Sequence, residues 1–247
     1  MKTVRLKIRR RENENAPSYW EEFEVPYRPA MNVIACLMAI QKNPVNAQGQ
    51  PTTPVAFESN CLEEVCGSCS MVINGKARQA CSALIDNLKQ PITLEPMDKF
   101  KVIRDLYIDR QAFFDALRKV KAWVDIDGSH DLGQGPRYSR QVQELRYDIS
   151  RCMTCGVCGQ VCPNYNSNTK FVGPHVAPQV VSFNLHPNGA FNKEERLEAL
   201  MDEGGIFECG NSQNCVSSCP KEIPLRQSIA QVKSEVTWTG IKSLFTK

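Results

Sequence analysis

Polar and apolar residues alternate along the first 25 residues and predict two strands. Val4, Leu6 and Ile8 are separated by polar residues, which is the period-two pattern of a half-buried strand. Phe23 and Val25 repeat the pattern after a polar stretch at residues 11–18. The two segments therefore predict a β-hairpin.

A helical pattern follows the second strand. Asn32 stands at an N-cap position, and apolar residues recur at helical spacing over residues 33–40, ahead of Pro44. Cys36 lies on this apolar face. Because it has no cysteine neighbour at ligand spacing, we expect it to be a small buried hydrophobe.

Two further signals complete a small mixed domain. The apolar residues 71–73 run into Asn74-Gly75, the strongest short hairpin signal, and residues 92–95 supply another strand. From Asp105 the apolar period becomes helical, with Leu106 as its first member, and it returns at residues 141–149, 176–185 and 193–201. The sequence thus predicts an α+β chain with domains 1–105 and 106–247, the second all helix and loop, including a loop at 127–136.

Composition narrows the functional classes. The 247 residues carry a net charge of +3, which gives no reason to expect nucleic acid, and no stretch approaches the roughly 18 apolar residues of a membrane span. The basic run at residues 7–11 is interpreted as a solvated strand end. The first residues lack the apolar core of a signal peptide, so we expect a reducing compartment, in which twelve clustered cysteines favour metal over disulfides.

Four cysteines in the first half have the plant-type spacing of a [2Fe–2S] centre. They are Cys61, Cys66, Cys69 and Cys81. Gly67 and the small Ser68 and Ser70 let the loop backbone wrap the sulfides closely and aim N–H groups at them. A four-cysteine zinc site is the alternative, but zinc sites usually pair two short knuckles, whereas one group here holds three cysteines.

The run CMTCGVCGQVCP at residues 152–163 has the spacing of bacterial ferredoxins, in which three thiolates hold one cluster and the fourth reaches another. A later group, Cys209, Cys215 and Cys219, has one cysteine fewer, and by register the missing position falls on Ser212. When the last cysteine of each run crosses over, a [4Fe–4S] centre is predicted. Its ligands are Cys152, Cys155, Cys158 and Cys219.

Three thiolates remain for the other cluster of the second half. Cys162, Cys209 and Cys215 predict a [3Fe–4S] centre, because no fourth thiolate is left for a fourth iron. A serine or water ligand that completes a fourth iron is the alternative. Pro163 and Pro220 each follow a crossing cysteine and turn the chain there.

The order [2Fe–2S], [4Fe–4S], [3Fe–4S] and the spacing of the ligands resemble the iron–sulfur subunits of succinate dehydrogenase and fumarate reductase. The resemblance covers essentially the whole chain. In that family a plant-ferredoxin β-grasp domain precedes a helical ferredoxin domain. The subunit lies between a flavoprotein with covalent FAD and a membrane anchor where quinone binds. The resemblance implies an electron-transfer subunit without substrate chemistry of its own, at the cytoplasmic face of the bacterial plasma membrane.

The quinone end departs from the ubiquinone-linked members of this family. Those carry tryptophans shortly after the first Cys-Pro and a histidine after the first cysteine of the last group, whereas this chain has Asn-Tyr-Asn-Ser at 164–167 and Gly210. Both features resemble menaquinone-linked enzymes whose single anchor polypeptide carries two b haems. Tyr165 and Lys221 each follow a Cys-Pro closely and are candidates for the quinone end, with a plain surface role as the alternative.

The three histidines, His130, His175 and His186, each lie in a loop that contains Gly or Pro, without a helical i, i+4 partner. We therefore expect exposed or locally bonded side chains rather than haem ligands.

Other functions compete with the succinate dehydrogenase interpretation. The chain could serve a fumarate reductase that runs in the reverse direction, a soluble thiol-linked fumarate reductase, or a glycolate oxidase, although the plant-type N-terminal group argues against the last. A zinc-binding interaction module without a redox role belongs to a different class. Visible absorbance that dithionite bleaches would distinguish iron–sulfur from zinc.

Overall fold

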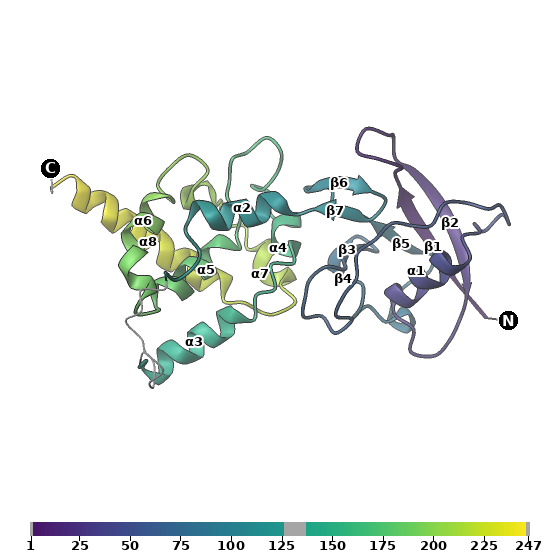
Figure 1. Ribbon diagram of the computed structural model, residues 1–247, viewed down its shortest axis with the longest axis horizontal. Coiled ribbons are helices and arrows are strands. Elements are labelled where there is room, and N and C mark those ends of the chain that lie inside the picture. Colours follow the sequence, from purple (N-terminus) through teal and green to yellow (C-terminus); the bar gives the residue numbers. More distant parts are fainter. Residues whose placement is uncertain (1, 126–136, 246–247) are drawn as a thin grey trace. The chain divides into compact units, whose positions relative to one another are not determined.

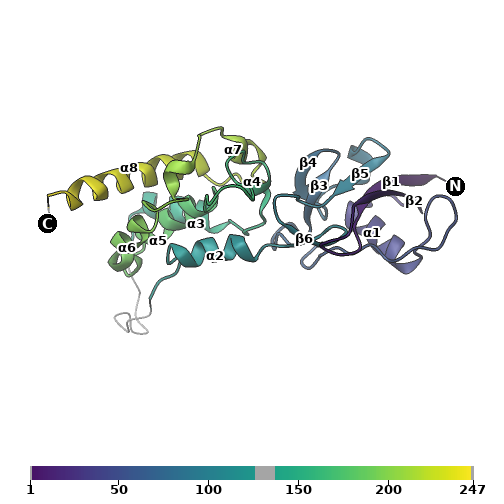
Figure 2. The same cartoon turned by 90° about the horizontal axis from the view of Figure 1, so that it is seen from above.

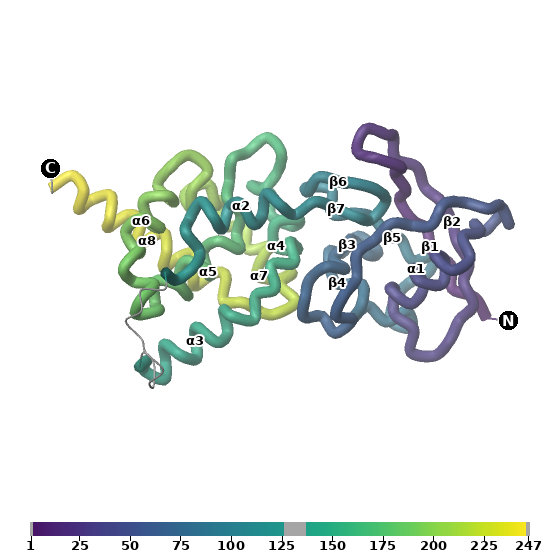
Figure 3. The backbone as a smooth tube through the Cα atoms, viewed as in Figure 1, coloured from purple at the N-terminus to yellow at the C-terminus, as the bar shows by residue number. Residues whose placement is uncertain are grey.

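The computed structural model describes residues 2–125 and 137–245, and the chain forms two compact units. The first contains residues up to Arg110 together with Met153–Gln160, and the second contains Gln111–Cys152 and the chain from Val161 onward. Figures 1 and 3 trace the chain through both units. The predicted domains, 1–105 and 106–247, differ from these units at residues 106–110 and 153–160.

A five-stranded sheet organises the first unit, with strand order β2-β1-β5-β3-β4 (Figure 1). The strands are β1 (Thr3–Arg10), β2 (Tyr19–Pro26), β3 (Ser70–Ile73), β4 (Lys76–Gln79) and β5 (Ile92–Glu95). β1 and β5 are parallel, whereas the other neighbours are antiparallel. Both predicted hairpins are present. In the first, Leu6 faces Phe23 and Val4 faces Val25, so that the alternating apolar residues form one buried face.

Helix α1 (Val33–Lys42) contributes its apolar face to the core of the first unit. The predicted N-cap is confirmed, because the Asn32 side chain accepts a hydrogen bond of 2.8 Å from the backbone N–H of Ala35. Cys36 is fully buried in the same core, as the sequence predicts for a small hydrophobe. A short 3-10 helix, η1 (Ile85–Asn87), precedes β5.

The predicted start of the helical half is wrong. Residues 101–109 form a second hairpin of β6 (Lys101–Arg104) and β7 (Tyr107–Asp109), and Leu106 lies in its turn. The helix α2 begins only at Gln111. Asp105 has a left-handed backbone (φ 46°) that reverses the chain, and this turn carries none of the Asn-Gly or Gly signals that reveal the other hairpin.

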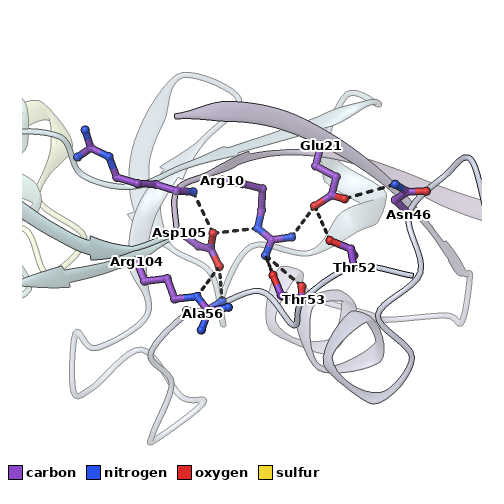
Figure 4. A network of polar contacts seen from close by, with 9 residues as sticks. Arg10, Glu21, Asn46, Thr52, Thr53, Ala56, Arg104 and Asp105 are labelled. Carbon is purple, nitrogen blue, oxygen red and sulfur yellow. Dashed lines mark hydrogen bonds and ion pairs between the residues drawn. The ribbon is translucent and has the colours of Figure 1, made fainter. Parts of the chain in front are cut away.

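The basic run at the end of β1 is not simply a solvated strand end, because Arg10 is buried. Figure 4 shows its polar contacts. Its guanidinium donates to Asp105 Oδ1 at 2.9 Å, to Glu21 Oε2 at 2.5 Å and to the backbone carbonyl of Thr53 at 3.0 Å. Asp105 Oδ2 accepts from the backbone N–H of Ala56 at 2.9 Å. The network joins β1, β2, the loop at 52–56 and the β6–β7 turn, so it fixes a loop that no strand holds.

Helices build the second unit, whose described residues contain no strand. They are α2 (Gln111–Lys119), α3 (Arg140–Ser150), α5 (Val176–Asn184), η2 (Gly189–Asn192), α6 (Lys193–Glu198), η3 (Ile206–Glu208), α7 (Asn214–Ser218) and α8 (Leu225–Ser243). α4 (Val157–Gln160) belongs to the first unit. The predicted helices are present, and the loop at 127–136 lies outside the described residues.

The longest helix, α8, is absent from the sequence prediction. Its first turns bury Leu225, Ile229, Val232 and Val236, and the helix contacts α5 and α6, whereas Trp238 is exposed. Figures 1 and 2 show the course of α8 from two sides. Because only its first part has a buried face, the apolar periodicity along the whole helix is weak. Among the described residues no helix is both long and apolar enough to span a lipid bilayer.

Candidate iron–sulfur centres and their surroundings

The loop at 61–69 directs backbone N–H groups at the first cysteine. Cys61 Sγ accepts from the N–H groups of Glu63 at 3.4 Å, Val65 at 3.3 Å and Cys66 at 3.3 Å. Left-handed backbone at Leu62 and Glu64 curls the chain around the sulfur. The loop thus surrounds this sulfur with hydrogen-bond donors, an arrangement that suits a sulfur ligand of a cluster.

The other thiols of this group experience opposite influences. Burial opposes ionisation of Cys66, but hydrogen bonds from Ser68 and Cys61 lower its pKa to about 6. Burial raises the pKa of Cys69 to about 12, and contact with the Cys81 thiol contributes to that rise. Two neighbouring buried thiols such as Cys69 and Cys81 do not both ionise readily unless a cation compensates their charge. The donor set therefore fits a metal centre.

A polar contact closes the loop on the side of the fourth cysteine. Ser82, which follows Cys81, donates its hydroxyl to Glu64 Oε1 at 2.8 Å. The contact joins the segment that carries the first ligands to the segment that carries the last. Sequence reasoning missed this pair, since neither residue type is a ligand.

The segment of the second cysteine run that belongs to the first unit is also closely packed. Cys155 is buried, and Gly156 has φ +87°, with Phe100 Cζ only 2.9 Å from the position that a Cβ would occupy. Gln160 accepts from the backbone N–H of Lys99 at 3.2 Å and donates to Asp98 at 2.7 Å. Glycine is therefore required directly after Cys155.

The ligands predicted for the [4Fe–4S] centre are divided between the units. Cys155 and Cys158 lie in the first unit, whereas Cys152 and Cys219 lie in the second. Cys152 follows α3, and Cys219 caps α7, where its sulfur accepts from the backbone N–H of Ile223 at 3.5 Å.

In the second unit one pocket gathers the three thiols predicted for the [3Fe–4S] centre. Cys162, Cys209 and Cys215 line it together with Ser212, the position where a fourth cysteine is missing. Burial raises the pKa of Cys215 to about 11, and the neighbouring Cys162 and Cys209 add to the rise. Charge on the two neighbouring thiols thus opposes ionisation of Cys215, and a bound cationic centre would relieve that repulsion.

Charged and polar residues support this pocket from α7 and α8. Lys233 Nζ donates to the carbonyl oxygen of Cys209 at 2.8 Å, and the Asn214 amide donates to the carbonyl of Val161 at 3.2 Å. Gln213 has a left-handed backbone (φ 60°) that opens α7. The sequence gives no signal for Lys233, because it lies 24 residues beyond the cysteine whose backbone it contacts.

The two candidates for the quinone end are both half-buried. Tyr165 packs edge-on against the Phe113 ring, with centroids 5.6 Å apart. Its neighbour Asn164 lines the pocket, whereas Tyr165 and Lys221, both of which the structure describes, are not among the lining residues.

The expectation of an exposed or locally bonded side chain is wrong for His175. It is buried, stacks on Phe113, and Nε2 lies 2.8 Å from the Phe113 carbonyl oxygen, 62 residues away. Nδ1 has no hydrogen-bond partner. His186 is locally bonded as predicted, since Nδ1 accepts from the N–H of Asn188 at 3.2 Å, and His130 lies outside the described residues.

The burial of His175 predicts a pH dependence of stability. Burial lowers the pKa of its imidazole to about 3, so the folded state holds the ring neutral while the unfolded state binds a proton below about pH 6.5. Stability should therefore fall with decreasing pH, by about 1 kcal/mol between pH 7 and pH 5.5 from this group alone. His175→Phe keeps a stacked ring and should flatten that slope in urea unfolding. Parallel slopes for the two proteins would contradict the prediction.

Two family models match the chain. A 2Fe-2S iron-sulfur cluster binding domain matches residues 5–115, and a 4Fe-4S dicluster domain matches residues 148–223. Both kinds of cluster domain predicted from the cysteine spacing are thereby confirmed, including their order.

Two relatives that match over most of their length are also iron–sulfur subunits. The chain is 58% identical to the succinate dehydrogenase iron-sulfur subunit of Bacillus subtilis, over 99% of this chain and 96% of that protein. It is 28% identical to the fumarate reductase iron-sulfur subunit of Wolinella succinogenes, over 88% and 90%. A chain of the Mycobacterium smegmatis Sdh1 complex has the same fold, with a TM-score of 0.78, 22% identity and 95% of both chains covered. The chain therefore belongs to the iron–sulfur electron-transfer subunits of the succinate dehydrogenase and fumarate reductase family.

Proposed function

We propose that this chain transfers electrons within a succinate:menaquinone oxidoreductase, between the FAD of a flavoprotein and a membrane anchor with b haems. As the resemblance to this family implies, the chain would lie at the cytoplasmic face of the bacterial plasma membrane. The 58% identity to a succinate dehydrogenase subunit favours succinate oxidation as the direction. We also propose that the first unit is a plant-type β-grasp domain and the second a helical ferredoxin domain.

Three sets of cysteines would hold the clusters. They are Cys61, Cys66, Cys69 and Cys81 for [2Fe–2S], Cys152, Cys155, Cys158 and Cys219 for [4Fe–4S], and Cys162, Cys209 and Cys215 for [3Fe–4S]. When bound, these groups would accept and release single electrons. The protein residues fix the thiolates, supply N–H groups to the sulfurs and set the local charge.

The pocket in the second unit is the observation that carries the proposal. Three cysteines and Ser212 line one pocket, which supports a centre with three thiolate ligands and no fourth cysteine. A structural zinc site in this pocket would require a fourth protein ligand for the usual tetrahedron.

Packing at the same pocket supports menaquinone over ubiquinone. A Cβ at Gly210 would lie 3.0 Å from Asn164 Oδ1, so the two positions that depart from the ubiquinone-linked pattern lie against each other. A histidine at 210 would have to displace the Asn164 amide. Tyr165 and Lys221 remain the proposed residues at the quinone end.

The test is an iron and spin inventory of the complex isolated from its native membrane. We expect about nine iron atoms per complex besides haem iron, since two, four and three irons are assigned to the ligand sets. Electron paramagnetic resonance should show an oxidised-state [3Fe–4S] signal. About ten non-haem irons without that signal would refute the three-ligand assignment.

The ligand crossover predicts the effect of a single substitution. Cys219→Ser should abolish or broaden the [4Fe–4S] signal, although Cys219 lies in the same run as Cys209 and Cys215. Cys36→Ser is the matched control, because Cys36 is buried in the first unit and is not a predicted ligand. Loss of the [3Fe–4S] signal alone would contradict the crossover.

A further inference from the structure

Two cysteine loops meet within the first unit. Gly67 lies between the ligands Cys66 and Cys69, and its backbone (φ +72°) packs directly against Cys155. A Cβ on Gly67 would stand 2.7 Å from Cys155 Cβ and 2.8 Å from Cys155 Cα. The loop assigned to [2Fe–2S] therefore touches a ligand assigned to [4Fe–4S], with no side chain between them.

One guanidinium bridges the same two loops. Arg110 Nη1 donates to the carbonyl oxygen of Gly67 at 3.2 Å and to the carbonyl oxygen of Thr154, the residue before Cys155, at 3.3 Å. Thr154 has a left-handed backbone (φ 49°) directly before Cys155. A planar guanidinium suits this task because one nitrogen carries two N–H groups in fixed directions.

The charge on Arg110 is only weakly balanced by protein groups. Its side chain is 13% exposed, and its ion pair with Glu58 is long, at 4.0 Å, to a carboxylate that is 37% exposed. Solvent screens the Glu58 carboxylate more than the guanidinium. A positive charge thus remains beside both loops, where it would stabilise the more negative, reduced form of a bound centre.

We propose that Arg110 is a positioning residue for electron transfer between the first two centres. It holds the loops in contact through Gly67 and Thr154, and its charge raises both reduction potentials together. The proposal rests on the ligand sets of the proposed function. A shared charge shifts both centres in the same direction, so it favours their reduction without creating an energy step between them.

The test uses the intact complex, with redox titrations of both centres followed by electron paramagnetic resonance. Arg110→Gln keeps a donor and removes the charge, Arg110→Lys keeps the charge and removes the planar fork, and Arg110→Met removes both. For the Gln and Met variants we expect the equilibrium constant for reduction of each centre to fall about tenfold, or about 59 mV for one electron. The Lys variant should stay within about twofold of the wild type.

The positioning role has its own readout. The magnetic interaction between the two reduced centres depends on their separation, so it should weaken in Arg110→Met, and less in Arg110→Gln. Arg5→Met is the control, because it removes one positive charge from an exposed position of β1 in the same unit. It should change neither quantity.

The outcomes distinguish the role proposed for Arg110 from the ligand assignment on which it rests. A wild-type complex without distinct [2Fe–2S] and [4Fe–4S] signals would overturn the ligand assignment. A wild type with both signals, and Gln and Met variants with unchanged potentials and magnetic interaction, would overturn the role of Arg110 alone. If Arg110→Met does not assemble, the comparison of Gln with Lys still decides the charge effect.

Discussion

Replacement of Asp105 by asparagine should lower the free energy of unfolding of the first unit by about 3–5 kcal/mol, the usual cost of breaking a buried ion pair. Asp105 is 1% exposed and accepts from Arg10 Nε, from the N–H of Arg11 at 3.0 Å and from the N–H of Ala56. Asparagine tolerates the left-handed backbone but carries no charge and turns one acceptor into a donor. Arg10 would then keep only Glu21 as a charged partner in this network.

Denaturant unfolding followed by visible absorbance of the [2Fe–2S] centre measures this effect. Asp86→Asn is the matched control, since Asp86 is exposed and accepts a single bond from the Tyr27 hydroxyl at 2.9 Å. We expect its free energy of unfolding to change by less than about 0.5 kcal/mol. Equal changes in the free energy of unfolding for both variants would show that the burial of Asp105 does not add to the cost of removing its charge.

Gly67→Ala should disrupt the first unit at its cysteine loops. The added methyl group would lie 2.7 Å from Cys155 Cβ, and alanine at φ +72° costs about 1–2 kcal/mol on backbone grounds alone. The clash is with backbone and Cβ atoms, which cannot rotate away, so one loop must move. We expect a total loss of roughly 3 kcal/mol or more, together with weaker or absent [2Fe–2S] and [4Fe–4S] signals.

Gly75→Ala is the control that separates the cost of backbone strain from the cost of the close contact with Cys155. Gly75 has nearly the same backbone (φ +77°), but nothing lies within 4 Å of the position of its Cβ. It should therefore show the backbone cost without the loss of either signal. If both alanine variants behave alike, the close approach of Gly67 to Cys155 is not what requires glycine.

Sequence reasoning was reliable where a local pattern has one physical solution. The alternation at Val4, Leu6 and Ile8, the Asn32 cap and the Asn74-Gly75 turn each predicted the observed element, because each depends on residues close in sequence. The cysteine spacings likewise identified both kinds of cluster domain.

Sequence reasoning failed where the interaction partner of a residue lies far away in sequence. Arg10 looked like an exposed charge because its partner Asp105 is 95 residues away, and His175 looked exposed because its partner Phe113 is 62 residues away. Helix α8 was missed because only its first part has a buried face. Arg110 carries no motif, since it contacts carbonyl groups that every residue possesses.

The return of Met153–Gln160 to the first unit has a consequence for how the chain is made. The chain leaves that unit after Arg110 and supplies its last segment only some forty residues later, before it leaves again at Val161. On a ribosome, which extends the chain from the N-terminus, the first unit therefore lacks part of its own structure until residue 160 has emerged. Met97 and Phe100, whose side chains lie beside Gly156, lack this neighbour until then. Maturation of the N-terminal part thus depends on synthesis of the cysteine run that begins the next part.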